Sequence, residues 1–195
     1  MKKPIAVLAA LSLGLAPVLV GCATQDQDPG ATPEQTATSA PTASVNDADK
    51  SFAAMMSVHH EQAIEMSDIV LAKQGIDTQV TNLAEQIKEA QGPEIEKLQS
   101  WQQEWGVEES HNMHDMGHGD GMMSEEDLQA LQEAEGVDAS KLFLEQMIAH
   151  HEGAVTMAED QIRDGSYQPA IDMAEQVVND QQAEIQQMKD MLAGL

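Results

Sequence analysis

Two His-His pairs are the residues of this sequence whose type and spacing could do chemistry. His59-His60 and His150-His151 each lie in a segment that also carries methionines. Imidazole nitrogen suits copper, zinc and nickel, whereas the soft thioether of methionine selects Cu(I). If the chain brings the two pairs together, we expect a metal site, with copper favoured over zinc.

The two pairs belong to an internal duplication. At an offset of 91, residues 52–66 match residues 143–157 through the pattern Phe-x3-Met-x2-His-His-Glu-x-Ala-[Ile/Val]-x-Met. At an offset of 90, residues 84–98 match residues 174–188 at several positions, so that one residue of slippage in a loop accounts for the change. Each half therefore predicts the same pair of helices.

Capping residues and a proline divide the first half: Asn46 or Asp47, Gly75, Asp77, Gly92-Pro93 and Gly106. We expect one helix to begin at Asn46 or Asp47 and to end at Gly75. A second helix would run from Asp77 to Gly106, with a kink at Pro93 because proline removes a backbone donor and clashes with the preceding turn.

The second half repeats this arrangement. Asp138 or Ser140 would cap a helix that ends near Gly165, and Ser166 would cap the last helix, with Pro169 in its first turn. A short helix follows Ser124, where Ser124-x-x-Asp127 resembles a capping box. The sequence therefore predicts an all-α fold, a four-helix bundle made from two duplicated helical hairpins.

The heptad pattern places the histidines toward the bundle interior. His59 and His150 occupy seam positions, and His60 and His151 lie at the shoulder of the seam. On the partner helices Glu94 and its repeat Glu184 also point inward. One interpretation is a His–Glu hydrogen bond that only sets register. The other is metal coordination by the histidines, with the glutamates orienting the imidazoles or acting as ligands.

The segment between the halves, residues 106–123, carries a second metal signature. Histidine and methionine alternate there among glycines, and we nominate five of them as ligands: His111, Met113, His114, Met116 and His118. Short His-rich tracts commonly bind metal, and the mixture with methionine points to copper, as Cu(I), Cu(II) or both. The alternative is a flexible polar loop in which the methionines are incidental.

The N-terminal residues have the features of an export signal. Lys2 and Lys3 precede an apolar stretch that ends in Leu-Val-Gly-Cys22, which resembles a bacterial lipobox. This predicts a signal peptide over 1–21, lipidation of Cys22, and a disordered tether over 22–45 before a domain at 46–195. The protein would then be anchored to the cell membrane by lipid, facing away from the cytoplasm. An ordinary signal peptide with a chance cysteine is the alternative.

Charge and cysteine content exclude several classes of protein. The 195 residues include 9 Lys+Arg and 34 Asp+Glu, a formal net charge of −25. Nucleic acid needs a basic face, so we expect no nucleic-acid partner, whereas cations are attracted. The single cysteine excludes disulfide frameworks and multi-cysteine metal sites.

The doubled His-His motif resembles the DUF305 family, over about residues 47–193. The resemblance implies a ferritin-like four-helix fold, an extracytoplasmic location and, for some members, copper binding or resistance. Carried over by motif, the implied ligands are His59, His60, Met56 and Met66, then His150, His151, Met147 and Met157. The His/Met-rich loop is not part of that pattern.

These features favour a lipid-anchored copper protein that sequesters or delivers the ion, with an unidentified partner if it delivers. Such a role needs no catalysis, so we expect no enzyme. A di-metal oxidase is one alternative, but it needs Glu-x-x-His motifs, and no glutamate lies three residues before any of the four histidines. A structural or interaction lipoprotein with core histidines is another.

Overall fold

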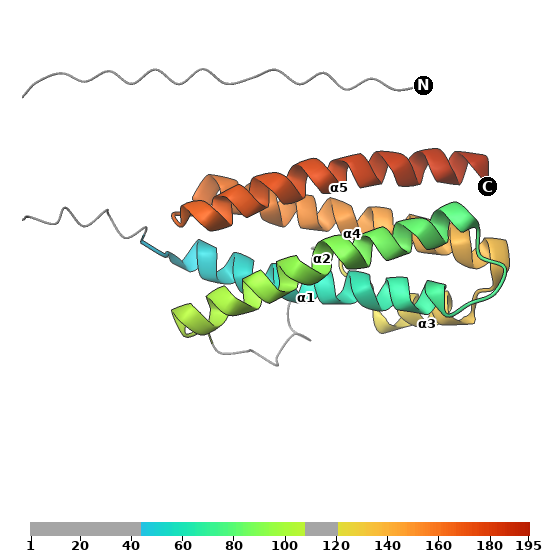
Figure 1. Ribbon diagram of the computed structural model, residues 1–195, viewed down its shortest axis with the longest axis horizontal. Coiled ribbons are helices and arrows are strands. Elements are labelled where there is room, and N and C mark those ends of the chain that lie inside the picture. Colours follow the sequence, from blue (N-terminus) through green and yellow to red (C-terminus); the bar gives the residue numbers. More distant parts are fainter. Residues whose placement is uncertain (1–43, 108–120) are drawn as a thin grey trace, which may run out of the picture. The chain divides into compact units, whose positions relative to one another are not determined.

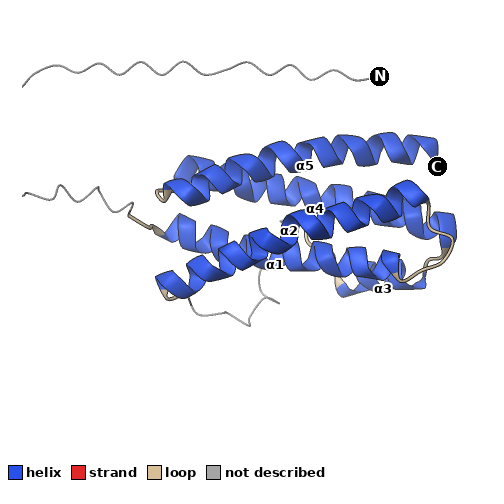
Figure 2. Cartoon of the chain, in the orientation of Figure 1, coloured by secondary structure: helices blue, strands red, loops and turns tan. Residues whose placement is uncertain are grey.

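A computed structural model of the chain describes residues 44–107 and 121–195. Within these ranges every regular element is an α-helix (Figure 2). The elements in chain order are α1 (Asp47–Leu71), α2 (Thr78–Trp105), α3 (Glu125–Glu133), α4 (Gly136–Asp164) and α5 (Gln168–Gly194). None of these helices combines the length and the apolarity needed to cross a membrane.

The four long helices form the predicted bundle (Figure 1). Helix α2 packs along α1, α5 packs along α4, and the two hairpins meet where α1 contacts α4. The short helix α3 contacts both α1 and α4. The prediction of an all-α fold from two helical hairpins is therefore confirmed.

Several predicted helix boundaries are confirmed by their caps. Asn46 caps α1 in a capping box with Asp49, and Asp77 caps α2 by accepting a hydrogen bond from the Gln79 amide. Ser124 forms the expected capping box with Asp127. Gly106 ends α2 in the left-handed region at φ 64°, where glycine carries no Cβ penalty.

Three other boundaries were predicted wrongly. Helix α1 ends at Leu71, before Gly75; α4 begins at Gly136 rather than at Asp138 or Ser140; and α5 follows Tyr167 rather than Ser166. The two serines serve other contacts. The Ser140 hydroxyl donates to the Gly136 carbonyl and accepts the Asp77 amide, and the Ser166 hydroxyl accepts from the Asn46 side chain.

Helix α2 continues through Pro93 without interruption, and the kink expected there stays a prediction. The residue before a proline normally avoids the helical region because its Cβ clashes with the proline ring. Gly92 has no Cβ, and Pro93 itself is exposed. The helix can therefore continue past the missing backbone donor.

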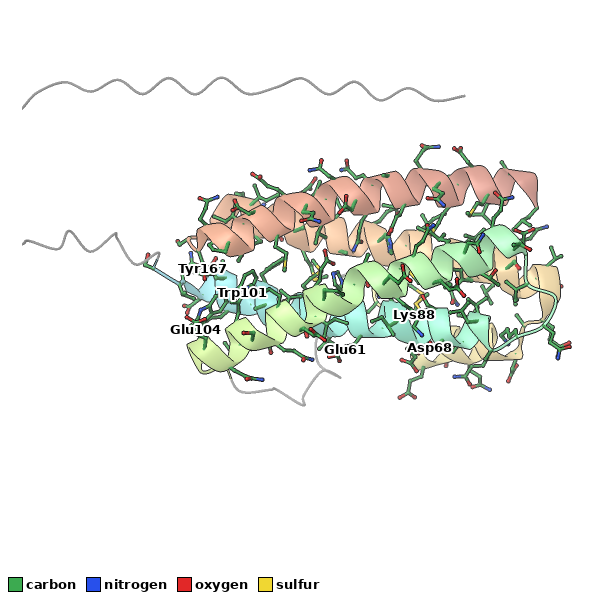
Figure 3. All side chains as sticks on the ribbon, viewed as in Figure 1. Glu61, Asp68, Lys88, Trp101, Glu104 and Tyr167 are labelled. Carbon is green, nitrogen blue, oxygen red and sulfur yellow. The ribbon has the colours of Figure 1, made fainter. Side chains whose placement is uncertain are left out.

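The core divides into two apolar clusters. One gathers Ala63 to Val70 of α1 with Val80 to Ile87 of α2 and residues of α3, α4 and α5. The other gathers Phe52 to Met56 of α1 with Leu98 and Trp101 of α2 and residues of α4 and α5. In the second cluster Trp101 meets Tyr167 edge-to-face, with ring centroids 5.7 Å apart, and so joins α2 to the start of α5 (Figure 3). On each of the four long helices, buried polar residues lie between the residues that belong to one cluster and those that belong to the other.

Candidate functional site

Four imidazoles lie in one layer between the two apolar clusters. His59 and His60 come from α1, and His150 and His151 come from α4; none is more than 2% exposed. The rings of His59 and His150 contact each other, with centroids 3.7 Å apart and planes at 36°. The heptad prediction that these two residues point into the bundle interior is confirmed. We call the four side chains the imidazole layer.

His60 and His151 each form a hydrogen bond with a glutamate on the other helix of the same hairpin. His60 Nε2 lies 2.9 Å from Glu94 Oε2, and His151 Nε2 lies 2.7 Å from Glu184 Oε2. The glutamate side chains are about one-fifth exposed. The expected inward orientation of both glutamates is confirmed, and the carboxylates reach from solvent into the edge of the layer.

Two glutamines were missed as members of this site. Gln91 and Gln181 are buried, and the Oε1 atom of each has no hydrogen-bond partner within residues 44–107 and 121–195. Each lies three residues before a layer-facing glutamate, on the same face of its helix. The duplication pairs them at an offset of 90, but it pairs the exposed Gln86 and Gln176 in the same way, so the repeat alone could not identify them.

Several nitrogens of the imidazole layer are unsatisfied. His60 Nδ1, His151 Nδ1 and both ring nitrogens of His150 are buried without a hydrogen-bond partner in the described part of the chain. A buried polar atom left unpaired typically costs about 1–3 kcal/mol. When Nε2 carries the proton that the glutamate accepts, the lone pair of Nδ1 remains inside the layer as a donor for a metal ion.

Protonation of the layer is disfavoured at its centre. Burial lowers the pKa of His150 well below its usual 6.5, and the neighbouring imidazoles of His59, His151 and His60 lower it further. His150 is therefore neutral at pH 7. Neutral imidazole is the form that coordinates metal ions.

The methionines implied as ligands flank the layer on both sides, and all four are buried. Met56 and Met157 belong to one apolar cluster, and Met66 and Met147 belong to the other. Each cluster thus receives one methionine from each copy of the motif. The packing of the hairpins therefore places one thioether from each copy of the motif on each side of the layer.

The donor types fit a soft or borderline ion, although the side chains do not form a finished cage. Within the two described ranges, no group of three or more His, Cys, Asp or Glu side chains is arranged to hold a metal ion. Imidazole nitrogens and thioether sulfurs are ligands that copper prefers, whereas magnesium and calcium prefer oxygen ligands. The structure thus groups the eight motif residues in and beside one layer.

The remaining predicted residues lie outside the described ranges. These are Cys22 and the five loop residues His111, Met113, His114, Met116 and His118, together with the predicted signal peptide over 1–21.

Known structures resemble this bundle. A DUF305 protein of Streptomyces coelicolor, assigned to the secreted proteins, is 33% identical and aligns with a TM-score of 0.69 over 75% of this chain and 93% of its own. A DUF305 fragment from Deinococcus radiodurans is 26% identical, with a TM-score of 0.70 over 77% of this chain and 99% of its own. No curated protein matches the sequence significantly.

A third similar structure is that of a copper-bound protein. CopM in its Cu(II)-bound form is 32% identical, with a TM-score of 0.65 over 75% of this chain and 96% of its own. CopM is also known in a Cu(I)-bound and an Ag-bound form.

The family model described as "Domain of unknown function (DUF305)" matches residues 49–192, which span all five helices and the imidazole layer. This chain therefore belongs to the DUF305 family.

Proposed function

We propose that this protein binds copper ions outside the cytoplasm and sequesters or delivers them, with the imidazole layer as its principal site. The observation that carries the proposal is the set of buried imidazole nitrogens of His60, His150 and His151 that find no hydrogen-bond partner among the described residues. A fold gains nothing from burying unpaired nitrogens, whereas a metal site needs them. The flanking methionines add the donor type that favours Cu(I).

Two further observations support copper as the ion. The copper- and silver-bound forms of CopM show that a protein about 30% identical over three-quarters of this chain holds these soft ions. The net charge of −25 attracts cations to the protein surface. Binding and release require no catalysis, so no reaction is part of the proposal.

The proposed location rests on the N-terminal segment. We propose that Cys22 carries a lipid and that residues 22–45 tether the bundle to the membrane. The lipobox-like Leu-Val-Gly-Cys sequence supports this, and the similarity to a Streptomyces protein assigned to the secreted proteins agrees with an extracytoplasmic site.

A Cu(I) titration of the purified protein tests the proposal. The protein would compete with a chromophoric Cu(I) chelator under anaerobic conditions, with Cu(II) and zinc titrated separately. A variant in which all four layer histidines are replaced by Gln would be measured beside it, because Gln keeps a polar side chain of moderate size in the core. Circular dichroism would establish that the variant remains helical.

Three results are distinguishable. Tight binding that is lost in a folded quadruple variant supports the imidazole layer as the site. Tight binding that survives in that variant moves the site to the loop histidines and methionines, which a second variant with His111, His114 and His118 changed to Gln would test. The absence of Cu(I) and Cu(II) binding by the wild-type protein would refute the proposal.

A further inference from the structure

The segment Gly121–Met123 contacts both helices that carry the imidazole layer. The Met123 amide donates to Gln62 Oε1 at 2.7 Å, and Gln62 Nε2 donates to the Met123 carbonyl at 2.9 Å, so one α1 side chain holds both polar groups of this residue. Gly121 lies against α4. A Cβ added to it would come within 2.5 Å of the Ala149 carbonyl oxygen and 3.0 Å of Gly153 Cα.

This contact uses a position at which the two copies of the duplicated motif differ. In His-His-Glu-x-Ala the position x is Gln62 in the first copy and Gly153 in the second. The first copy therefore provides the side chain that grips the segment, and the second provides the space into which the segment packs. Gly121 itself has φ 77°, so an L side chain there would meet both backbone strain and a steric clash.

The segment lies beside the layer, on the flank of α1 and α4 that faces away from α2 and α5; α3 also contacts both α1 and α4. Successive residues of a helix are separated by about 100°, so Gln62 lies on the opposite side of His59 from His60. His60 faces Glu94 of α2, and His151 faces Glu184 of α5. By the same geometry Gly153 and Ala149 lie on the opposite side of His150 from His151. The segment therefore bridges α1 and α4 beside the His59–His150 contact, away from α2 and α5.

We propose that Gly121–Met123 is a strap that closes the imidazole layer to solvent and ions, and that Gln62 and Gly153 are the positioning residues that hold it. Opening this strap breaks the two Gln62 hydrogen bonds, the Gly121 contact and the packing of Met123 against the core, whereas opening the other flank would separate whole helices. The inference rests on the proposed function for its biological meaning, because the ions that pass the strap are the copper ions proposed above.

The test compares Gln62→Ala with the wild-type protein and with Gln186→Ala. Gln186 is exposed on α5, and within the described residues its side chain forms a hydrogen bond only with Asp190. Its substitution is therefore a matched control. The first readout is the rate at which diethyl pyrocarbonate modifies each histidine of the metal-free protein, resolved by peptide mass spectrometry. The second is the rate of Cu(I) uptake from a chromophoric chelator complex.

In Gln62→Ala we expect modification of His59 and His150 to accelerate about tenfold or more, because two hydrogen bonds that oppose local opening are lost. Copper uptake should accelerate in parallel, and Gln186→Ala should behave as wild type. A second variant, Gly153→Gln, places in the second copy the residue that the first copy carries. It should displace Gly121 and open the same flank.

The outcomes separate the strap from the proposed function. Unchanged modification in both variants would overturn the strap, whatever the copper result. An equal acceleration at all four layer histidines would indicate general unfolding and would also overturn it. If modification accelerates but the wild-type protein binds no copper, the strap stands and the proposed function fails. If copper binds and its uptake is unaffected, the strap does not control ion access.

Discussion

At the scale of single residues, Asp49 shows how a buried carboxylate can stabilise this bundle. It is fully buried in the first turn of α1 and accepts hydrogen bonds from the amides of Asn46, Ser166 and Tyr167 and from the Gln161 side chain. These contacts tie the start of α1 to the turn between α4 and α5. Burial raises the pKa of Asp49, but the hydrogen bonds outweigh it, so its pKa lies below the ordinary 3.8.

Replacing Asp49 with Asn should therefore destabilise the protein in a pH-dependent way. At pH 7 we expect the free energy of unfolding to fall by about 2 kcal/mol, because charge-assisted hydrogen bonds are lost and an amide NH2 faces backbone donors. A carboxylate whose pKa is lowered on folding contributes stability above its unfolded pKa, and this contribution disappears as pH falls through the folded pKa. The difference between wild type and variant should shrink below about pH 4. Urea unfolding at several pH values measures it.

The duplication supplies the control for this prediction. Ser140 is the repeat of Asp49; it is buried and binds the Asp77 amide in the turn between α1 and α2. Ser140→Ala should cost about 1 kcal/mol with no pH dependence of its own, since a hydroxyl does not titrate in this range. If Asp49→Asn lost the same stability at pH 3 as at pH 7, the role assigned to the charge would be wrong.

At the same scale, the imidazole layer could be predicted only in part. The heptad pattern correctly placed His59 and His150 in the bundle interior and turned Glu94 and Glu184 inward, but it did not predict the contact between the two histidine rings. The polar repeat Gln91/Gln181 was visible but carried no marker that separated it from the many exposed glutamines. Burial of a single amide depends on which face the neighbouring hairpin covers, and this is a tertiary property.

At the scale of the elements, α2 and α5 differ at one position that affects helix stability. Pro93 of α2 corresponds in the duplication to Ala183 of α5, and both helices continue through this point. Pro93 cannot donate a backbone hydrogen bond, and its exposed ring contributes little packing. The first hairpin therefore carries a local cost that the second hairpin does not.

Pro93→Ala should stabilise the protein because it restores the backbone donor and removes the clash with the preceding turn. We expect the free energy of unfolding to rise by about 1–3 kcal/mol, and thermal or urea unfolding would measure it. The matched substitution Ala183→Pro should have the opposite effect, of about 3 kcal/mol or more. A loss of stability in Pro93→Ala would show that the proline shapes α2 in a way the surrounding packing requires.

Helix ends were the least predictable features of the elements. Asn46, Asp77 and Ser124 cap helices as their type suggests, because their side chains meet the amides of their own first turns. Ser140 and Ser166 have the same capacity, but their hydroxyls bind the neighbouring hairpin. Competition between a local cap and a contact distant in sequence is decided only when the hairpins pack.

At the scale of the whole molecule, charge repulsion opposes folding. The chain has 34 acidic and 9 basic residues. A few exposed ion pairs offset this repulsion locally, such as Lys88 with Asp68 (Figure 3) and Lys189 with Glu152. Exposed pairs of this kind contribute little each, so most of the negative charge is uncompensated.

Salt should therefore stabilise the metal-free protein. Raising NaCl from about 10 mM to about 150 mM shortens the screening length from about 30 Å to about 8 Å, and we expect the melting temperature to rise by a few degrees. EDTA keeps trace metal from binding during the measurement. KCl at equal ionic strength should act in the same way, whereas a melting temperature that stays constant or falls with salt would contradict the dominance of repulsion.

The sequence by itself determined the helical fold, the duplication, the inward direction of His59 and His150 and the acidic character, because each depends on local periodicity, repetition or composition. Only the tertiary structure decided how the copies combine. It divides the methionines of each copy between two clusters and uses Gln62 and Gly153, at equivalent positions, for opposite purposes. Among the residues that the structure describes, it also leaves buried imidazole nitrogens without hydrogen-bond partners. The reason is that these outcomes depend on contacts between residues distant in sequence, which form only when the two hairpins pack together.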